Sequence, residues 1–569
     1  MNWKTTALVL GVLIVGVAIL AKMATRLPAP PDHQVFINGD VLTMDASTRM
    51  VEAVSVRGER IEAVGSTDEI MALVSNQTEV VDLRGRTLMP GFIDAHGHFP
   101  GSGMSVIAAD LTSPPVGNKQ SMEEVLAALK ERAASIEPGK WVSGFGYDDT
   151  LLAEQRHPTR AELDEVSTEH PVVAMHVSGH MVVVNSMALE LVGISAETEN
   201  PVGGVIARRE GSREPNGLLE ENARLGVVDA MQDTGVLAVY QMIKTAVRDY
   251  AQVGVTTAQS GGTSVMLSDG LSLFSKLGVI PQRLVLFAFD TEFAELIDAG
   301  EFDPQKYYSD RVRMPAVKLV ADGSIQGYTG YLSHPYHMPF KGDESYRGYP
   351  SISREVLFDR VQRLHGLGYQ LAIHGNGDES IEDILDAFEA AQQAHPRDDA
   401  RMILIHSQMA REDQIARMKG LGVTPSFFSA HTYYWGDRHR DIFMGPERAA
   451  AMSPARWAQQ YKLRFSSHMD TPVTPMLPLQ AVWSQVYRLS YGGDVIGEDQ
   501  RIDVMSALRA VTIDAAWQVF QEDRVGSLEA GKLADMIILS ASPLADPMSM
   551  RDLKVERTLI GGATIYRRQ

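Results

Sequence analysis

The sequence contains no cysteine among its 569 residues. A chain without cysteine has no disulfide, no thiolate ligand for zinc, no cysteine nucleophile and no acylated cysteine anchor. Basic residues are also in the minority, because 52 Lys and Arg stand against 72 Asp and Glu and give a formal net charge of -20. Binding of nucleic-acid phosphates needs clustered basic residues, so the composition argues against a nucleic-acid partner. The length suits a large barrel with an accessory domain.

Polar residues are lacking in one long run near the N-terminus, from about Thr5 to Ala21, which Lys22 and Arg26 follow. The run is short for a membrane-spanning helix and long for the core of a signal peptide, and no small-x-small cleavage site follows it. We therefore expect residues 1–30 to form an uncleaved membrane anchor and tether, with a cleaved signal segment as the alternative. The flanking charges leave the orientation open. Because the absence of cysteine suits an oxidising compartment, we expect the folded part on the periplasmic side.

Short alternating strands occur near both ends of the chain. In the N-terminal part, three turn signals predict hairpins of a small antiparallel sheet: Asn38-Gly39, Arg57-Gly58 and Arg84-Gly85. Similar strands return near the C-terminus. A sheet made from both ends implies a domain interrupted by everything between them. We therefore predict a composite β-sandwich domain from residues 31–88 and 525–569.

Between these ends, apolar runs alternate with helical patterns, which is typical of parallel βα units. Eight runs fit strands: Met89–Ala95, Val255–Gln259, Arg283–Phe287, Ala316–Val320, Gln370–Ile373, Met402–Ile405, Val423–Phe427 and Leu463–Ser466. Eight such units predict the α/β fold class and a (β/α)8 TIM-type barrel over residues 89–524. The first gap is far longer than one helix needs, so we expect an inserted subdomain at about residues 104–250.

The residues that follow these strands share one kind of chemistry. In a (β/α)8 barrel the loops at the carboxyl ends of the strands form the active site. His96 and His98 follow the first strand, and an extended backbone directs both imidazoles to the same side. Four later strand ends carry Lys318, His374, His406 and Asp470. Each of these residues alone has an ordinary structural explanation, such as a core histidine or a helix cap. Together they favour a metal site, because imidazole and carboxylate are ligands of zinc and similar ions.

Longer motifs carry a resemblance to a known family. They are Pro90-Gly-Phe-Ile-Asp-Ala-His-Gly-His98, Gly179-His-Met-Val-Val-Val-Asn-Ser-Met-Ala-Leu189, Val317-Lys-Leu-Val-Ala-Asp-Gly-Ser324, Ile373-His-Gly-Asn-Gly-Asp378, Ile405-His-Ser-Gln408, His431-Thr-Tyr-Tyr-Trp-Gly-Asp437, Asp470-Thr-Pro-Val473 and Gly526-Ser-Leu-Glu-Ala-Gly-Lys-Leu-Ala-Asp535. The chain resembles the metal-dependent amidohydrolase superfamily, in the family-3 branch of N-substituted formamide deformylase-like enzymes. The resemblance covers nearly all of the chain after the N-terminal segment. It is specific for the branch and says little about the substrate.

The resemblance implies two divalent metal ions, for which we expect zinc, while manganese, iron and cobalt stay open. Six residues would hold them: His96, His98 and Asp470 at one ion, His374 and His406 at the other, and Lys318 between the two. It further implies that Lys318 carries a carbamate derived from carbon dioxide. An ammonium beside two dications is strongly disfavoured, whereas a carbamate supplies two oxygens and a negative charge.

The resemblance also implies hydrolysis of a carbon–nitrogen bond in a small-molecule amide or N-acyl substrate. A metal-activated hydroxide would attack the carbonyl, Asp470 would take its proton and pass it to the leaving nitrogen, and His180 or His431 would steady the oxyanion. Hydrolysis of an ester, lactone or carbamate is the enzymatic alternative. A catalytically retired, membrane-tethered binding or regulatory protein is the other. A homo-oligomer is compatible with the sequence.

The chain departs from the family at the eighth strand, where Ser466-Ser-His-Met-Asp470 replaces the usual Gly-Ser-Asp. His468 is therefore either a residue that supports the ligands or a competing ligand. The second strand ends in Gln259-Ser260-Gly261, without a histidine or aspartate. His431 lies beside three aromatic residues and has a nearly equal alternative as a packed core histidine. Asp322-Gly-Ser324 is expected to form a turn.

Overall fold

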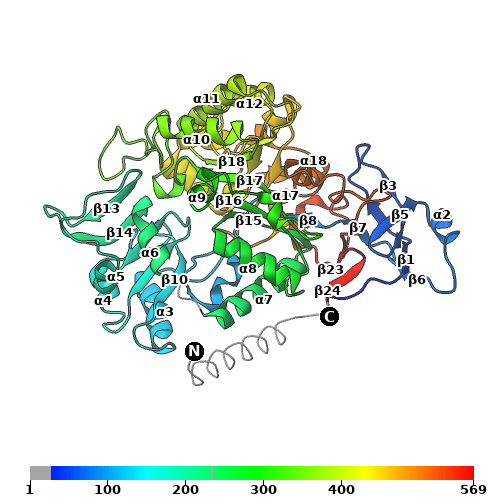
Figure 1. Cartoon of the computed structure of the whole chain (residues 1–569), viewed down its shortest axis with the longest axis horizontal. Helices are drawn as coiled ribbons and strands as arrows, with labels where there is room; N and C mark the ends of the chain where they lie inside the picture. The colour runs from blue at the N-terminus through cyan, green and yellow to red at the C-terminus, as the bar shows by residue number, and fades with distance from the viewer. Residues whose placement is uncertain (1–26, 232–234) are drawn as a thin grey trace.

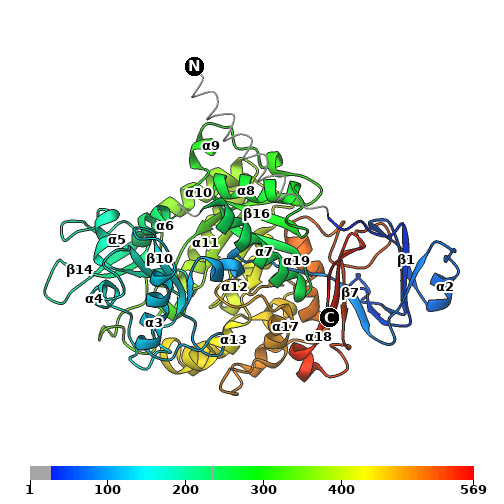
Figure 2. The ribbon, with the colours of Figure 1, turned by 90° about the horizontal axis from the view of Figure 1, so that it is seen from below.

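The computed structural model describes residues 27–231 and 235–569. The predicted anchor, residues 1–30, lies almost entirely outside them. In the described part of the chain no helix is long and apolar enough to cross a membrane. Three regions lie in a row (Figures 1 and 2): the insertion at one end, the barrel in the centre, and strands from both chain ends at the other end.

Eight parallel strands form the central sheet, and they follow one another in chain order. They are β8 (Phe92–Ile93), β15 (Val255–Thr263), β16 (Arg283–Phe289), β17 (Val312–Val320), β18 (Gln370–Gly375), β19 (Met402–His406), β20 (Val423–Phe427) and β21 (Ser466–Ser467). This order of parallel strands with intervening helices confirms the α/β class and fits a TIM-type barrel. The loops after the first and last strands are bonded to each other. Asp470 N donates to His96 O at 3.2 Å, and His98 N donates to Thr471 O at 2.7 Å.

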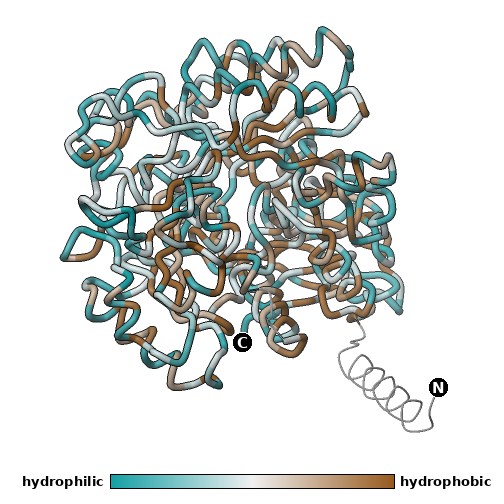
Figure 3. The backbone as a smooth tube through the Cα atoms, turned by 60° about the vertical axis from the view of Figure 1, so that its left-hand side comes forward, coloured by the Kyte–Doolittle hydropathy of each residue, from teal (hydrophilic) through white to brown (hydrophobic). Residues whose placement is uncertain are grey.

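Helices cover the outside of this sheet. They include α7 (Val236–Gln252), α8 (Val265–Lys276), α9 (Ala294–Asp298), α10 (Arg354–Gly366), α11 (Asp378–Ala394), α12 (Glu412–Leu421), α17 (Pro478–Tyr487), α18 (Val504–Ala510) and α19 (Ile513–Gln518). Every residue of β18, β19 and β20 is buried. Strands covered on both faces have apolar residues in a continuous run rather than in alternation. Figure 3 shows the same division, with apolar stretches inside the molecule and hydrophilic ones at its rim.

The first and last barrel strands differ from their predicted bounds. The run Met89–Ala95 is not one strand. Its beginning belongs to β7 (Thr87–Pro90), which pairs with a C-terminal strand, and only Phe92 and Ile93 enter the barrel. The backbone changes partner between the two strands, because Gly91 N donates to Asp535 O and Phe92 N donates to Gly254 O. The last strand is shifted from Leu463–Ser466 to Ser466–Ser467.

Two further sheets contain strands from the chain ends. One has the order β5 (Arg60–Gly65), β4 (Ala53–Arg57), β1 (His33–Ile37), β6 (Glu79–Asp82); the other has the order β24 (Ala563–Arg567), β23 (Val555–Ile560), β22 (Met536–Leu539), β7, β2 (Asp40–Leu42), β3 (Met50–Val51). Phe36, Leu88, Ile538 and Leu559 are among the residues of one buried cluster that draws on both sheets. The second sheet thus joins the two ends of the chain.

Only one of the three predicted hairpins forms. The turn at Arg57-Gly58 connects the antiparallel pair β4 and β5. The turns at Asn38-Gly39 and Arg84-Gly85 instead lead the chain from one sheet to the other, because β1 pairs with β4 and β6 whereas β2 pairs with β3 and β7. Each sheet also contains a parallel pair, so neither is purely antiparallel. A tight turn fixes the local direction of the chain but not the partner of the next strand.

The long gap after β8 contains the fourth sheet of the described residues, which has six strands. Its order is β13 (Gly204–Arg208), β14 (Pro215–Glu221), β12 (Met181–Val184), β11 (Val172–His176), β10 (Val142–Tyr147), β9 (Ala109–Asp110). Four helices accompany it: α3 (Met122–Ala134), α4 (Arg160–Asp164), α5 (Ser186–Leu191) and α6 (Leu225–Ala230). Helix α7 then leads back into the barrel, where Ala251 O accepts a hydrogen bond of 2.7 Å from Thr558 of β23.

A buried ion pair links the barrel to the C-terminal strands. Arg283 at the start of β16 donates to both carboxylate oxygens of Asp535, at 2.6 and 2.9 Å. The same carboxylate accepts a hydrogen bond of 2.7 Å from Gly561 N. Two parallel bonds between guanidinium and carboxylate are the strong geometry for this pair. The pair therefore fixes the terminal sheet against the barrel.

We expect Asp535→Ala to lower the free energy of unfolding by about 3–5 kcal/mol, because it leaves the Arg283 charge buried without a partner. Urea denaturation of both proteins measures the difference. Glu199→Ala is the matched control, since it breaks an exposed pair with Arg213 and should lower the free energy of unfolding far less. If both variants lost the same free energy of unfolding, burial would not make the Asp535–Arg283 pair more stabilising than the exposed pair.

Candidate metal centre

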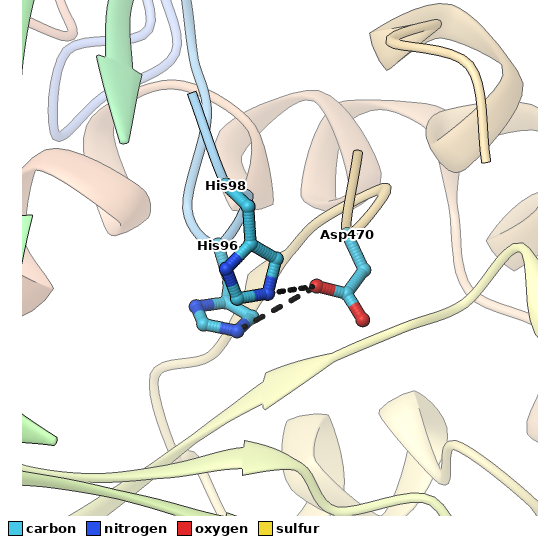
Figure 4. A group of neighbouring side chains, drawn as sticks. All are labelled: His96, His98 and Asp470. Carbon is cyan, nitrogen blue, oxygen red and sulfur yellow. Dashed lines mark ion pairs between the residues drawn. The ribbon is translucent and has the colours of Figure 1, made fainter. Parts of the chain in front are cut away.

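The carboxyl ends of the barrel strands bring the predicted ligands together. His96 and His98 follow β8, and the others are Lys318 on β17, His374 on β18, His406 on β19 and Asp470 after β21. All are buried except His98, whose side chain is 44% exposed. Figure 4 shows His96 and His98 on one loop and Asp470 on another, with their side chains pointing toward one another. The site therefore opens to solvent on the side of His98.

His96, His98 and Asp470 form one group of donor atoms. Asp470 Oδ1 lies 3.3 Å from His98 Nε2 and 3.6 Å from His96 Nε2. This oxygen is buried and makes no hydrogen bond within the described residues. Donor atoms that each lie about 2.0–2.1 Å from a tetrahedral ion are about 3.3 Å apart. The group therefore fits one shared cation, which would also satisfy the unpaired oxygen.

His374 and His406 form a second group. His406 Nε2 lies 3.0 Å from His374 Nδ1. The other ring nitrogen of His374 lies 3.2 Å from the carbonyl oxygen of Gly323. The side-chain nitrogen of Asn376 lies 3.0 Å from the same ring nitrogen, and an amide nitrogen only donates, so these contacts do not select one tautomer of His374. Two buried imidazole nitrogens at this separation fit a second cation.

Lys318 lies next to the first group. Its Nζ is 3.4 Å from His96 Nε2, and the side chain is buried. Burial lowers the pKa of Lys318 to about 7, and the opposite charge of Asp470 offsets part of that effect. Burial also holds the pKa of His96, His374 and His406 well below the usual histidine value. Neutral imidazoles are the form that binds a metal ion.

The pKa of Asp470 lies below its usual value. Burial alone would raise the pKa of Asp470, but its contact with His98 and the other basic groups around it outweigh that effect, so the carboxylate is anionic at neutral pH. The backbone of Asp470 is left-handed, with φ of 54°, and so are those of His406 and Ser407, with φ of 68° and 45°. Such conformations cost about 1–3 kcal/mol each and cluster at functional sites. The site thus combines one anion, neutral imidazoles and a strained backbone.

His468 contacts the ring nitrogen of His406 that does not face His374. Its Nε2 lies 3.1 Å from His406 Nδ1, and its Nδ1 lies 2.9 Å from Ser426 Oγ. Burial lowers the pKa of His468 to about 3. Both nitrogens of His468 therefore have protein neighbours, and this geometry favours the supporting role over that of a competing ligand.

Gln259 is a site residue that the sequence did not reveal. Its amide nitrogen donates to Ala95 O at 2.8 Å, so its oxygen faces His96 Nδ1 at 3.0 Å. His96 must then carry its proton on Nδ1, which leaves the Nε2 lone pair for a metal. The sequence signal that could have indicated Gln259 is the position of this polar residue at the end of an apolar strand.

The insertion brings His180 to the site. The ring of His180 lies 5.1 Å from that of His374, centroid to centroid. His431, at the start of α13 (His431–Tyr434), instead packs on Phe428 at 4.0 Å and on Trp435 at 5.5 Å. This packing is the alternative that the sequence left open for His431.

Asp322 positions the loops around the site. Its carboxylate accepts from the backbone N–H groups of Asn376, Gly377 and Tyr331, at 2.8–2.9 Å. Burial nevertheless raises the pKa of Asp322 to about 7. The predicted turn at Asp322-Gly-Ser324 is therefore fixed to the loop that follows His374.

We expect Gln259→Leu to weaken metal binding about 10- to 100-fold, because His96 loses the partner that fixes its tautomer. Competition with a chromophoric chelator measures the affinity. Gln282→Leu is the matched control, since Gln282 is also buried but bonds only to Val247 O, and it should leave metal affinity unchanged. If Gln259→Leu bound metal as tightly as the parent protein, Gln259 would have no role in fixing the tautomer of His96.

Comparison with known proteins agrees with this geometry. N-substituted formamide deformylase of Arthrobacter pascens is 30% identical over 543 residues, which cover 94% of this chain and 98% of that protein. Protein LONG AFTER FAR-RED 3 of Arabidopsis thaliana is 28% identical over 93% of this chain and 91% of its own length. Among solved structures, an uncharacterized metal-dependent hydrolase of Pyrococcus horikoshii superposes with a TM-score of 0.71 at 25% identity and covers 91% of this chain and 99% of its own.

The family model that matches is that of the amidohydrolase family, and it covers residues 79–566. This span contains the barrel, the insertion and every residue of the two donor groups. The match and the convergence of these residues at one barrel mouth lead to the same conclusion, that the chain belongs to the amidohydrolase family and is a metal-dependent hydrolase.

Proposed function

We propose that this hydrolase cleaves an N-acyl amide, foremost an N-formyl amine. The chain acts on carbon–nitrogen bonds other than peptide bonds, as its family and the deformylase relative indicate. The observation that carries the proposal is the set of six donors at one barrel mouth, where the Asp470 carboxylate faces the imidazoles of His96 and His98. An esterase or a retired regulatory barrel is not needed to explain a donor set of this kind.

The donor chemistry fits two divalent cations, and we propose zinc. Six residues would hold them: His96, His98 and Asp470 at one, His374 and His406 at the other, and Lys318, carboxylated by carbon dioxide, between them. Carboxylation requires a neutral amine, and burial keeps the pKa of Lys318 low enough to supply it. When bound, the cations would polarise the scissile carbonyl and activate water.

The residues of the chain would move the protons. Asp470 is anionic, is buried beside His98, and has one carboxylate oxygen without a hydrogen bond. It is therefore placed to take a proton from the attacking water and to return it to the leaving nitrogen. His180 lies beside His374 and would contact the substrate.

The direct test is a panel of N-formyl amines, N-acyl amino acids and aryl amides, each paired with the ester of the same acyl group. Metal content is measured on the same protein sample. We expect turnover of the formamides to exceed that of their esters, with two equivalents of bound metal. Metal-loaded protein that hydrolyses the esters and none of the amides would overturn the proposal.

We expect Asp470→Asn to retain bound metal but to lose turnover by about 10²- to 10⁴-fold, because an amide offers an oxygen ligand but does not accept the proton. Metal analysis and steady-state kinetics check the two halves separately. The control is Asp437→Asn, which changes an acidic residue on α14 (Gly436–Arg438) and should keep normal turnover. Normal turnover in Asp470→Asn would transfer the proton-accepting role to another residue.

We expect both Lys318→Ala and Lys318→Arg to lose bound metal and activity. Arginine keeps the positive charge but is effectively never deprotonated, so it does not take up carbon dioxide. Addition of a small carboxylic acid should restore part of the activity to Lys318→Ala, where the gap admits it, and not to Lys318→Arg. An active Lys318→Arg protein with two bound metals would rule out the bridging carbamate.

A further inference from the structure

The insertion places a partly buried histidine–carboxylate pair beside the candidate metal centre. His180 lies in the turn between β11 and β12, and Glu221 ends β14. His180 Nδ1 lies 2.8 Å from Glu221 Oε2, and Glu221 N donates to His180 O at 2.8 Å. We propose that this pair is the site that recognises the N–H group of a secondary amide, with Glu221 as the residue that positions His180. The inference rests on the proposed function and names the substrate class within it.

The tautomer of His180 follows from its partner. A carboxylate accepts and does not donate, so His180 carries its proton on Nδ1 toward Glu221. The lone pair of Nε2 then points away from Glu221. In this tautomer Nε2 of His180 accepts a hydrogen bond instead of donating one, in contrast to the oxyanion-steadying role expected from the sequence. The N–H of an N-monosubstituted amide is the donor that this nitrogen would take from a substrate held at the cations.

The backbone of Glu221 is strained. Its φ of 48° and ψ of -122° lie outside the regions that residues with a side chain prefer. Such a conformation costs about 1–3 kcal/mol and persists only where the surroundings enforce it. Here the register of β12 and β14, with Met181 opposite Glu220, holds Glu221 next to His180. The fold therefore maintains this contact at a cost.

The Glu221 carboxylate is buried, and only one of its two oxygens has a hydrogen-bond partner within the described residues. Glu221 is 4% exposed, and its Oε1 has no hydrogen-bond partner within the described residues. A Cβ atom on Gly323 would lie 2.1 Å from this oxygen, so only glycine permits the loop after β17 to pass there. The carbonyl of the same Gly323 contacts His374 Nε2. Gly323 thus connects the Glu221 side of the pair to the second donor group.

The test measures kcat and KM of the holoenzyme with an N-monosubstituted formamide, the matching N,N-disubstituted formamide and the formate ester. Glu221→Gln should lower kcat/KM for the N-monosubstituted substrate about 5- to 100-fold, because the glutamine amide can donate to Nδ1 and leave Nε2 protonated. The two substrates without N–H should change by less than about 2-fold. Equal losses for all three would overturn the inference.

A double-mutant cycle separates positioning from structural damage. In a His180→Ala background, Glu221→Gln should have no further effect, because Glu221 acts through His180. Additive losses would contradict this. Glu220→Gln is the matched control, since Glu220 is the neighbouring buried acid, bonds to Tyr349 and does not contact His180. It should keep the substrate preference of the parent.

A measurement without turnover tests the pair independently of the proposed function. In protein labelled with [¹⁵N]histidine, the carboxylate-bound Nδ1 proton of His180 should give a low-field NMR signal. The signal should be absent in His180→Asn and in Glu221→Gln and present in Glu220→Gln. A signal that persists in Glu221→Gln would overturn the inference, even if the protein hydrolysed none of the amides tested. If the signal behaves as expected and no amide is turned over, the pair stands and the proposed function fails.

Discussion

The structure depends on two backbone hydrogen bonds that join the beginning of the barrel to its end. His98 N binds Thr471 O, and Asp470 N binds His96 O. β8 and β21 contribute two residues each, so the strands themselves give little pairing with which to close the sheet. The loops that follow them provide the contact, and these loops carry three of the candidate metal ligands. Closure of the barrel and assembly of the first donor group are therefore the same event.

Much of the fold was predictable because burial leaves a strong trace in sequence. Strands covered on both faces are apolar throughout, and six of the eight runs coincide with barrel strands to within a few residues. The first run was misassigned for a physical reason. Met89 belongs to a strand of the terminal sheet and Phe92 to a strand of the barrel, yet both are buried in the same apolar cluster, and hydrophobicity does not show which sheet a buried residue joins.

The candidate site likewise contains residues that the sequence predicts and residues that it does not. The donors were predictable because ligand-type residues occur at several strand ends that a barrel gathers at one mouth. Their partners were not, because Gln259 and Glu221 contact residues 163 and 41 positions away and neither belongs to a recognisable motif. A glutamine amide and a lone carboxylate have many uses in a protein. Only the fold shows that each fixes the tautomer of one histidine.

The double membership of the segment Thr87–Ile93 has a consequence for synthesis on the ribosome. Its first half pairs with β22, and the Gly91 N–H just before β8 bonds to Asp535 O. Asp470 and β22, the C-terminal partner of β7, both lie in the last fifth of the chain, whereas the other partner of β7, β2, precedes it. A nascent chain thus carries His96 and His98 for most of translation without the partners that complete their binding site. The first donor group is therefore complete only after Asp470 has left the ribosome.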